Sequence, residues 1–268
     1  MHNESLVSVA AWVIVASCLP AVAQEDTNRI TSLSVAKARE LAARRGGLSF
    51  ASLPTLSVEA AEALLAHDGA LALDGLATLP EDVAVVLARH RGALSFGGLR
   101  TLPDDVAESL AGHAGMLYLN GVTQLSDAAA EALARHAGDV FLGDVSPLSA
   151  RAARAFARRP GVLDLERLTT LTPEAAGALA VHEGVLMLDG LTALPDDVAE
   201  ALGRHRGALH LGGVRTLTPA AARGLAAHDG VVLLDGLTGA PKEAIEILAA
   251  NRDVKLPRAL RPRLQAAP

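Results

Sequence analysis

Residues 70–92 read ALALDGLATLPEDVAVVLARHRG, and this stretch contains two different hydrophobic periods in succession. Leu71 and Leu73 alternate with small or polar residues, which predicts a short β-strand with both leucines facing inward. Val83 and Leu87 then follow the spacing of one helix face, which predicts a helix of about ten residues. The stretch therefore encodes a strand, a loop and a helix.

The boundaries of these elements carry matching signals. Gly75 permits a tight bend after the strand, and we expect Gly92 to end the helix in a left-handed conformation. Pro80 and the acids Glu81 and Asp82 suit the first turn of a helix and its positive dipole end. In other units the position of Pro80 holds a hydroxyl residue that could cap the helix: Ser57, Ser126, Ser149, Thr172 and Thr218.

The whole pattern returns every 23 residues without an insertion. Its first inward position is occupied by Leu48, Leu71, Leu94, Leu117, Val140, Leu163, Leu186, Leu209 and Val232. Its second is occupied by Phe50, Leu73, Phe96, Leu119, Leu142, Leu165, Leu188, Leu211 and Leu234. A partial unit precedes these nine from Ile30, and a shortened one follows at Val254 and Leu256. Such regularity predicts one repeat protein rather than two separate domains.

Strand, loop and helix in this order predict a right-handed α/β solenoid. Its strands should form one parallel β-sheet and its helices a second layer. Because helices need about 8–10 Å of spacing and strands about 4.8 Å, the sheet should lie on the concave face and the short helices on the convex face. We expect the solenoid, about ten repeats, over residues 24–256, with a C-terminal tail at 257–268.

The unit pattern L-x-L-x-G-L-x-x-L, followed by Ser, Thr or Pro, an acid and A-x-x-L-A, resembles that of the leucine-rich repeat family. It is most similar to the cysteine-containing subtype and covers residues 30 to about 256. Two features depart from the family pattern. Leu or Val stands where the family's loop has Asn or Cys, and the leading Leu is missing at Asp68, Arg91 and Ala114. The resemblance implies a binding scaffold, usually for protein, and it implies no reaction.

The composition disfavours several classes of function. With 50% hydrophobic residues the chain can bury a core, but with 2% aromatic residues Ala and Leu must supply most of it. A net charge of −6 gives no support for nucleic-acid binding. The chain has no H-E-x-x-H, G-x-S-x-G or phosphate-binding glycine motif, so we expect neither an enzyme nor a cofactor.

The N-terminus has the pattern of an export signal. An apolar run from Leu6 to Cys18 precedes Ala21-Val22-Ala23, which matches a signal-peptidase site, so residues 1–23 are predicted to be a signal peptide and Gln24 the mature start. The protein would then be secreted, periplasmic or at the cell surface, with no membrane span. Two alternatives remain: a lipoprotein anchored at Cys18, and an uncleaved anchor of 18 apolar residues.

Seven histidines occupy one position at the end of the predicted helices: His67, His90, His113, His136, His182, His205 and His228. Adjacent imidazoles could bind a metal ion. Arg44, Arg159 and Asn251 fill the same position in other units, however, and neither Arg nor Asn replaces a zinc-ligating imidazole. We therefore interpret the column as structural, donating hydrogen bonds to carbonyls at the helix end, and expect no metal site.

Residues that differ between repeats are the candidates for binding. The outward strand position is small in the first three units and becomes bulky from the fourth onward. The predicted ligand-binding patch on the concave face comprises Met116, Tyr118, Phe141, Asp164, Met187 and His210. Exposed aromatic and Met side chains in one area are typical of protein-binding surfaces, although drift on a tolerant surface would give a similar pattern.

The helix of the sixth unit is unusually basic. Arg151 and Arg154 stand where other units carry acids. A basic stripe could bind an anionic partner, but we expect these arginines to pair with Glu131 and Glu174 on the flanking helices.

Two functions follow from these observations. The first is an exported, non-enzymatic recognition scaffold that binds a protein or cell-envelope ligand through the concave face. The second is a structural or assembly element of the cell envelope that self-associates without a discrete ligand.

Overall fold

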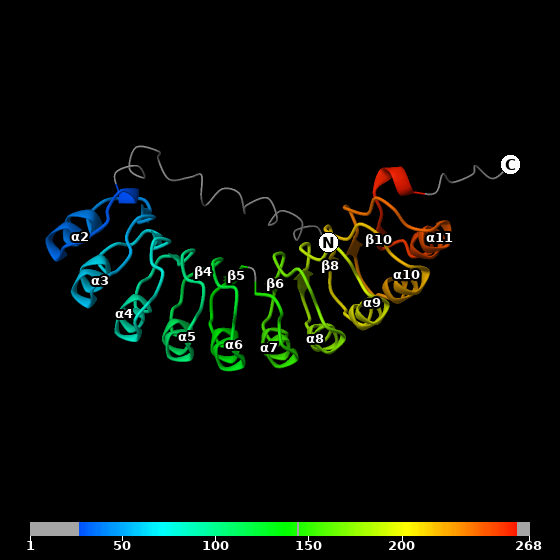
Figure 1. Ribbon diagram of the computed structural model, residues 1–268, viewed down its shortest axis with the longest axis horizontal. Coiled ribbons are helices and arrows are strands. Elements are labelled where there is room, and N and C mark those ends of the chain that lie inside the picture. The colour runs from blue at the N-terminus through cyan, green and yellow to red at the C-terminus, as the bar shows by residue number, and fades with distance from the viewer. Residues whose placement is uncertain (1–26, 144, 262–268) are drawn as a thin grey trace, which may run out of the picture.

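The computed structural model describes residues 27–143 and 145–261. Figure 1 shows an arch of stacked units, in which the helices form the outer, convex side and the strands lie toward the inner, concave side. The layer order predicted from the hydrophobic periods is therefore confirmed. The predicted signal peptide and Cys18 lie outside the described residues.

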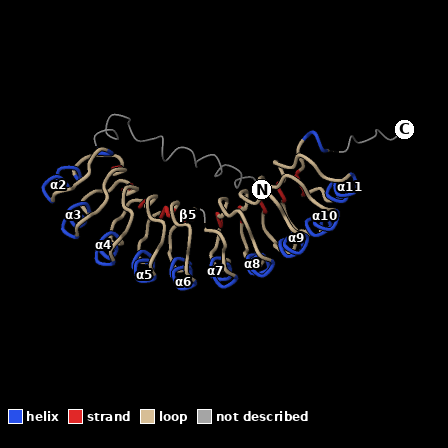
Figure 2. The backbone as a smooth tube through the Cα atoms, in the orientation of Figure 1, coloured by secondary structure: helices blue, strands red, loops and turns tan. Residues whose placement is uncertain are grey.

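Strands and helices alternate along the described chain, as Figure 2 shows. The strands are β1 Leu48–Ser49, β2 Leu71–Ala72, β3 Leu94–Ser95, β4 Leu117–Leu119, β5 Val140–Leu142, β6 Val162–Asp164, β7 Val185–Met187, β8 Leu209–His210, β9 Val232–Leu233 and β10 Val254–Lys255. The helices are α2 Val35–Ala42, α3 Val58–Leu64, α4 Glu81–Leu87, α5 Asp104–Ala111, α6 Asp127–Ala134, α7 Ala150–Phe156, α8 Pro173–Leu179, α9 Asp196–Leu202, α10 Pro219–Ala226 and α11 Lys242–Ala250. A 3-10 turn, η2 Arg258–Leu260, follows β10.

Neighbouring strands pair in parallel at the spacing of the repeat. Leu48 pairs with Leu71, and Leu71 with Leu94, so the inward positions of successive units lie in register. Leu71 and Leu73 are fully buried, as expected for the two inward positions. In α2 to α10 the alanine at one repeat position is also fully buried, which lets adjacent helices approach closely: Ala38, Ala61, Ala84, Ala107, Ala130, Ala153, Ala176, Ala199 and Ala222.

The expectation of one continuous sheet is wrong. The strands form two five-stranded sheets, β1 to β5 and β6 to β10. The interruption falls in the unit that departs furthest from the repeat, where Arg159-Pro160-Gly161 leads into β6. Gly161 adopts a positive φ of 88°, as do Gly46 and Gly230 at the same repeat position.

The predicted helix caps are confirmed. The hydroxyl of Ser126 accepts a hydrogen bond from the backbone N–H of Ala129 at 2.9 Å. Equivalent bonds are made by Ser57, Ser149, Thr172 and Thr218. Pro80 occupies the cap position itself, immediately before the first residue of α4. Each such bond satisfies one of the free N–H groups at the start of a helix.

Gly92 does not act as the left-handed helix stop that we expected. Helix α4 ends at Leu87, its cap residue Ala88 has a right-handed conformation, and Gly92 is absent from the glycines with positive φ among the described residues. A Cβ atom at Gly92 would instead overlap the carbonyl oxygen of Gly69 in the preceding unit. The glycine is needed because neighbouring units approach closely at this point.

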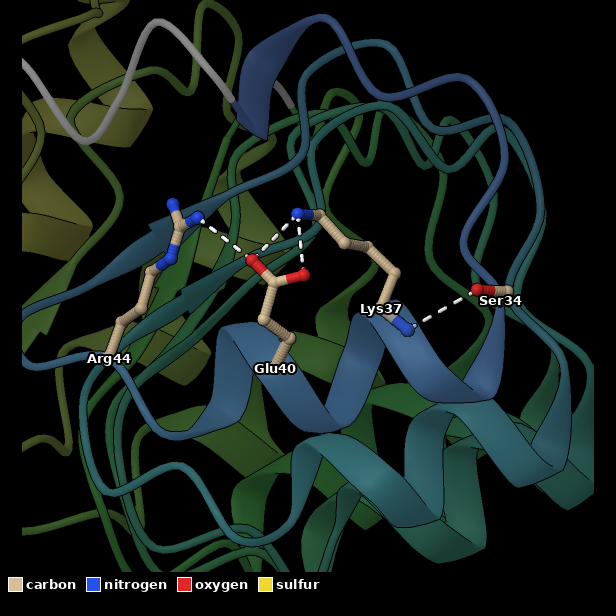
Figure 3. Close-up of polar contacts among 4 residues, drawn as sticks. All are labelled: Ser34, Lys37, Glu40 and Arg44. Atoms are coloured by element: carbon tan, nitrogen blue, oxygen red, sulfur yellow. Dashed lines mark hydrogen bonds and ion pairs between the residues drawn. The ribbon is translucent and has the colours of Figure 1, made fainter.

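A polar helix surface covers the N-terminal end of the stack. Ser34 caps α2, and on its outer surface Glu40 pairs with Lys37 at 2.8 Å and with Arg44 at 3.3 Å (Figure 3). Terminal units of solenoids have no further unit to cover them, so a polar outer face keeps this end compatible with water.

At the other end, η2 lies beside the last strand. Leu260 is partly buried against the core, so part of the predicted tail 257–268 continues the packed structure. Within the described ranges, none of the helices has the length and apolar character needed to cross a membrane.

Candidate binding face

The outward position of each strand forms a column along the concave face. Half-buried members are Ser49, Ala72, Ser95, Tyr118, Met187, His210 and Leu233. The side chains are small on β1 to β3 and become large from β4 onward, so the column has a smooth part and a bulky part. The bulky part contains five of the six predicted binding residues, and Met116 lies in the neighbouring column immediately before β4.

Tyr118 and Phe141 form an aromatic stack on neighbouring strands. They pair directly across β4 and β5, with ring centroids 4.6 Å apart and ring planes inclined by 19°. The Tyr118 hydroxyl points back along its own strand and lies 3.5 Å from the sulfur of Met116. Its pKa is raised by burial and by the nearby negative charge of Asp139, so the phenol remains a neutral hydrogen-bond donor.

Two predicted residues differ from the expectation in exposure. Phe141 is 8% exposed and Asp164 is 5% exposed, whereas we expected both to project into solvent. Phe141 is covered on one side by the stacked Tyr118 ring. Asp164 occupies the same column on β6, where it pairs with Met187 of β7.

Asp164 is only partly satisfied by the protein. Its Oδ1 accepts a hydrogen bond from the backbone N–H of Glu166 at 3.0 Å. Its Oδ2 is buried and has no hydrogen-bond partner among the described residues. Burial, together with the charges of Glu166 and Asp189, raises the pKa of this carboxyl to about 6. The site therefore holds one carboxylate oxygen that lacks a donor.

The column that precedes the strands adds apolar surface to the same face. Met116 is 39% exposed, Val162 56% and Val231 36%. Val162 and Val231 were not among the predicted site residues, although they occupy the same repeat position as Met116. They can be recognised in the sequence by comparing, across all units, the residue immediately before the first inward position. We call Met116, Tyr118, Phe141, Val162 and Met187, which lie on or next to β4 to β7, the concave apolar patch.

The histidine column is a buried ladder that joins one unit to the next. His90, His136 and His228 each donate from Nε2 to a glycine carbonyl of the preceding unit, at 2.8 to 2.9 Å. The structural interpretation is confirmed, but these carbonyls belong to the preceding unit's helix-to-strand turn rather than to the histidine's own helix. Neighbouring rings also lie close together, with His67 and His90 stacked at 6.4 Å.

Arg159 and Asn251 occupy the same position and make the same kind of bond. Arg159 donates to the carbonyl oxygens of Leu133, His136 and Gly138, and Asn251 donates to those of Ala226 and His228. Within the described part of the chain, no group of three or more His, Cys, Asp or Glu side chains is arranged to hold a metal ion. Most members of this column therefore supply hydrogen-bond donors between units. His205 instead accepts from the N–H of Gly207 in its own unit, and the ring nitrogens of His113 have no hydrogen-bond partner among the described residues.

Burial keeps several of these imidazoles neutral. It lowers the pKa of His90, His113 and His136, and lowers that of His205 to about 4 with the help of His228 and His182.

Three solved structures share features of this architecture. One is a leucine-rich repeat protein of Leptospira interrogans, with 14% identity, 93% of this chain and 86% of that chain covered, and a TM-score of 0.39. The second is the yeast complex of Rad7 and Elc1, with 16% identity, 84% and 66% covered, and a TM-score of 0.44. The third is the Drosophila Toll–Spätzle complex, with 15% identity, 84% and 41% covered, and a TM-score of 0.39. No family model matches the chain, and neither does any curated protein.

The repeats of the chain itself provide the deciding observation. Strand, loop and helix recur every 23 residues, with leucine or another apolar residue at the inward strand positions. These units fit the leucine-rich repeat family. The likeness to the cysteine-containing subtype stays a prediction.

The convex face of this solenoid has charged side chains, several of which pair with one another. Arg151 pairs with Glu131 at 2.7 Å, as expected, whereas no ion pair joins Arg154 to Glu174 among the described residues. A cleft of about 920 Å³ lies at α9 and α10. Two of its arginines, Arg204 and Arg223, already pair with Glu200 and Glu243. The concave face therefore remains the better candidate for binding.

Proposed function

We propose that the protein is an exported, non-enzymatic recognition scaffold that binds a protein or cell-envelope ligand through its concave face. The observation that carries this proposal is the concave apolar patch around the stacked Tyr118 and Phe141 rings. Apolar side chains that contact water in one area are unfavourable in the unbound protein. Removing them from water when a partner covers them favours binding.

Aromatic and Met side chains suit this role for different reasons. Tyr118 and Phe141 have few rotatable bonds, so they lose little entropy on binding, and their stacking orients the two rings in advance. Met116 and Met187 have flexible side chains that can adapt to the surface of a partner. The patch thus combines a rigid centre with adaptable contacts on either side.

Affinity capture tests the proposal. The full chain, immobilised, is exposed to an extracellular or envelope fraction, and captured proteins or glycans are identified and then titrated individually. We expect Tyr118→Ala to lower the affinity for a specific partner by at least about tenfold, the effect typical of an interface hot spot. Arg154→Ala is the matched control, because Arg154 is exposed on the convex face. A partner that depends on Arg154 and not on Tyr118 would contradict the proposal.

The same experiment addresses the alternative of self-association. If the protein captures mainly copies of itself, and Tyr118→Ala leaves that association intact, the structural role is favoured instead. Export rests on the sequence pattern Ala21-Val22-Ala23 and is tested separately by the intact mass of the exported protein. We expect a chain beginning at Gln24, and a lipid on Cys18 or an intact Met1 would contradict this.

A further inference from the structure

We propose that, in the uncleaved chain, the apolar segment 6–23 binds the part of the concave apolar patch that belongs to the first sheet, at Met116, Tyr118 and Phe141. The first occupant of this surface is then a piece of the same chain, and the predicted cleavage after Ala23 exposes the surface to an external partner. This inference rests on the proposed function in one respect, because it uses the same patch as a binding surface.

The described chain begins beside the first sheet. The hydroxyl of Ser49, the outward residue of β1, donates a hydrogen bond to Oδ1 of Asn28 at 2.6 Å. Thr27 is buried, with 1% of its surface exposed. Residues 1–26 lie outside the described ranges, but only residues 24–26 separate the apolar segment from Thr27. The segment is therefore tethered next to β1, at one end of the concave column.

The first sheet provides a continuous path from this point to the patch. Strands β1 to β5 pair within one sheet, and the outward residues of β1 to β3 are Ser or Ala, whose small side chains let another chain pass close to the sheet. Three strand spacings place Tyr118 about 14 Å from Ser49. The residues from Trp12 to Asn28 would span about 24 Å as a helix and about 50 Å as an extended chain, so Trp12 can reach the patch in either form.

The chemistry of the segment matches that of the patch. Segment 6–23 contains no charged residue, and Trp12 is its one aromatic residue. Met116 is 39% exposed and Tyr118 is half-buried, so both present apolar surface to a ligand. Contact between the segment and the patch would remove two apolar surfaces from water at once.

The tether makes even a weak contact sufficient. A short flexible connection gives the segment an effective concentration of about 1 mM at the patch. An intrinsic dissociation constant of about 0.1 mM would then keep the segment bound in about nine of ten chains. An external partner would have to compete with it.

The second sheet supplies a matched control residue. Val231 occupies the same repeat position as Met116 and is 36% exposed, but it precedes β9. It lies several units further from β1, beyond the interruption between the two sheets. A lysine at either position would remain partly exposed, so both variants should fold, and far-ultraviolet circular dichroism checks this.

The fluorescence of Trp12 tests the inference, because it is the only tryptophan in the chain. The uncleaved chain is made by cell-free synthesis without membranes and kept in reducing buffer, since Cys18 is the only cysteine. Acrylamide quenching of Trp12 is measured in wild type, Met116→Lys and Val231→Lys, with the urea-unfolded chain as the exposed reference. We expect quenching in folded wild type to be several-fold weaker than in urea.

The two lysine variants locate the contact. Met116→Lys places a charge against an uncharged segment and should raise quenching close to the value in urea, whereas Val231→Lys should keep the wild-type value. Full quenching in wild type would overturn the inference, and so would protection of Trp12 that Met116→Lys leaves intact. Protection that increases with protein concentration would show that a second copy covers the segment, which also overturns the contact within one chain.

Capture of a partner separates this inference from the proposed function. If Trp12 is fully quenched while a Tyr118-dependent partner is captured, the inference fails and the proposed function stands. If Met116→Lys releases Trp12 but no partner depends on Tyr118, the inference stands and the proposed function fails. Where both hold, the uncleaved chain should bind the partner about tenfold more weakly than the chain beginning at Gln24, because the segment competes for the patch.

Discussion

At the scale of single residues, Asp164 shows how a buried and incompletely paired carboxyl group can reduce the stability of the protein that carries it. Its carboxyl is buried, has one oxygen without a donor among the described residues, and lies near the negative charges of Glu166 and Asp189. Its folded-state pKa of about 6 lies above the ordinary value of 3.8. A carboxyl group whose pKa is higher in the folded protein than in the unfolded chain stabilises the folded state. This stabilisation is complete at a pH below the pKa in the unfolded chain, and it is lost as the pH rises through the pKa in the folded protein.

Asp164→Asn should therefore stabilise the unbound protein at neutral pH. The shift corresponds to a gain of about 1–3 kcal/mol at pH 7.5, because asparagine carries no charge to bury. The gain should shrink as the pH falls from 6 toward 4, where the wild-type carboxyl becomes protonated in the folded state. Urea unfolding of both proteins at pH 7.5 and pH 4.5 measures this. A variant that is less stable than wild type at pH 7.5 would show that the carboxylate is stabilised by the fold.

Two neighbouring arginines, Arg158 and Arg159, should differ strongly in their contribution to stability. Arg159 donates to three backbone carbonyls, two of them at 2.8 and 2.9 Å, whereas Arg158 is exposed and makes no such bond among the described residues. Arg159→Ala should cost about 2–4 kcal/mol because these carbonyls lose their donor. Arg158→Ala should stay within about 0.5 kcal/mol. Denaturation midpoints of the two variants make the comparison, and equal midpoints would contradict the bridging role of Arg159.

At the scale of elements, the strand register separates tolerated from damaging substitutions. Leu142 of β5 is 4% exposed and pairs with Leu119, so Leu142→Asp would bury a carboxylate among apolar neighbours. We expect it to cost more than about 3 kcal/mol and to prevent stable folding. Ala72→Ser on the outward column is the control, since Ser49 and Ser95 already flank it. Similar melting temperatures for both variants would show that the register is wrong.

The elements could be predicted because each of them repeats a local signal. The change from alternation at Leu71 and Leu73 to helical spacing at Leu87 follows from side-chain burial within one unit. The interruption between β5 and β6 could not be predicted in this way. At this junction no hydrophobic position is lost and the period continues unchanged, so the sequence pattern contains no sign of the interruption.

On the concave face, too, the sequence of one repeat does not reveal features that depend on neighbouring units. Sequence variation along the outward column indicated where Tyr118 and Met187 would lie, because that column has no role in the core. It could not show that Phe141 and Asp164 are buried, since their exposure depends on side chains one unit away. The free oxygen of Asp164 is therefore a feature of the assembled face and not of its own repeat.

At the scale of the whole molecule, the solenoid is held together by contacts between successive units, and the histidine ladder is a recurring part of them. The bonds from His90, His136 and His228 to glycine carbonyls each cross one unit boundary. Because stability in such a stack depends on nearest-neighbour interfaces, a change that affects every interface acts on the entire molecule. Acid is such a change, since it protonates imidazoles.

We therefore expect the solenoid to lose stability as the pH falls below about 6.5, the ordinary histidine pKa. Burial lowers the pKa of His90, His113, His136 and His205, the last to about 4. Below pH 6.5 the unfolded chain therefore binds more protons at these histidines than the folded protein does. Each such histidine makes its full contribution to the free energy of unfolding at a pH above its pKa in the unfolded chain. As the pH falls toward its pKa in the folded protein, this contribution declines by up to about 1.4 kcal/mol per pH unit. Asp164 acts in the opposite direction between pH 6 and 4, so Asp164→Asn is the background in which the histidine contribution is measured most directly.

The measurement is the free energy of unfolding in urea at pH 7.5, 6.0 and 5.0, which should fall across this range. His205→Asn identifies the source, because Asn251 already occupies the same column and donates to two carbonyls there. That variant removes one titrating group and should make the decline shallower by about 1 kcal/mol per pH unit. Ala72→Ser, which removes no titrating group, should follow the wild-type slope. A stability that does not change from pH 7.5 to 5.0 would mean that protons reach the imidazoles without disrupting the contacts between units, and the ladder would then not hold the stack together.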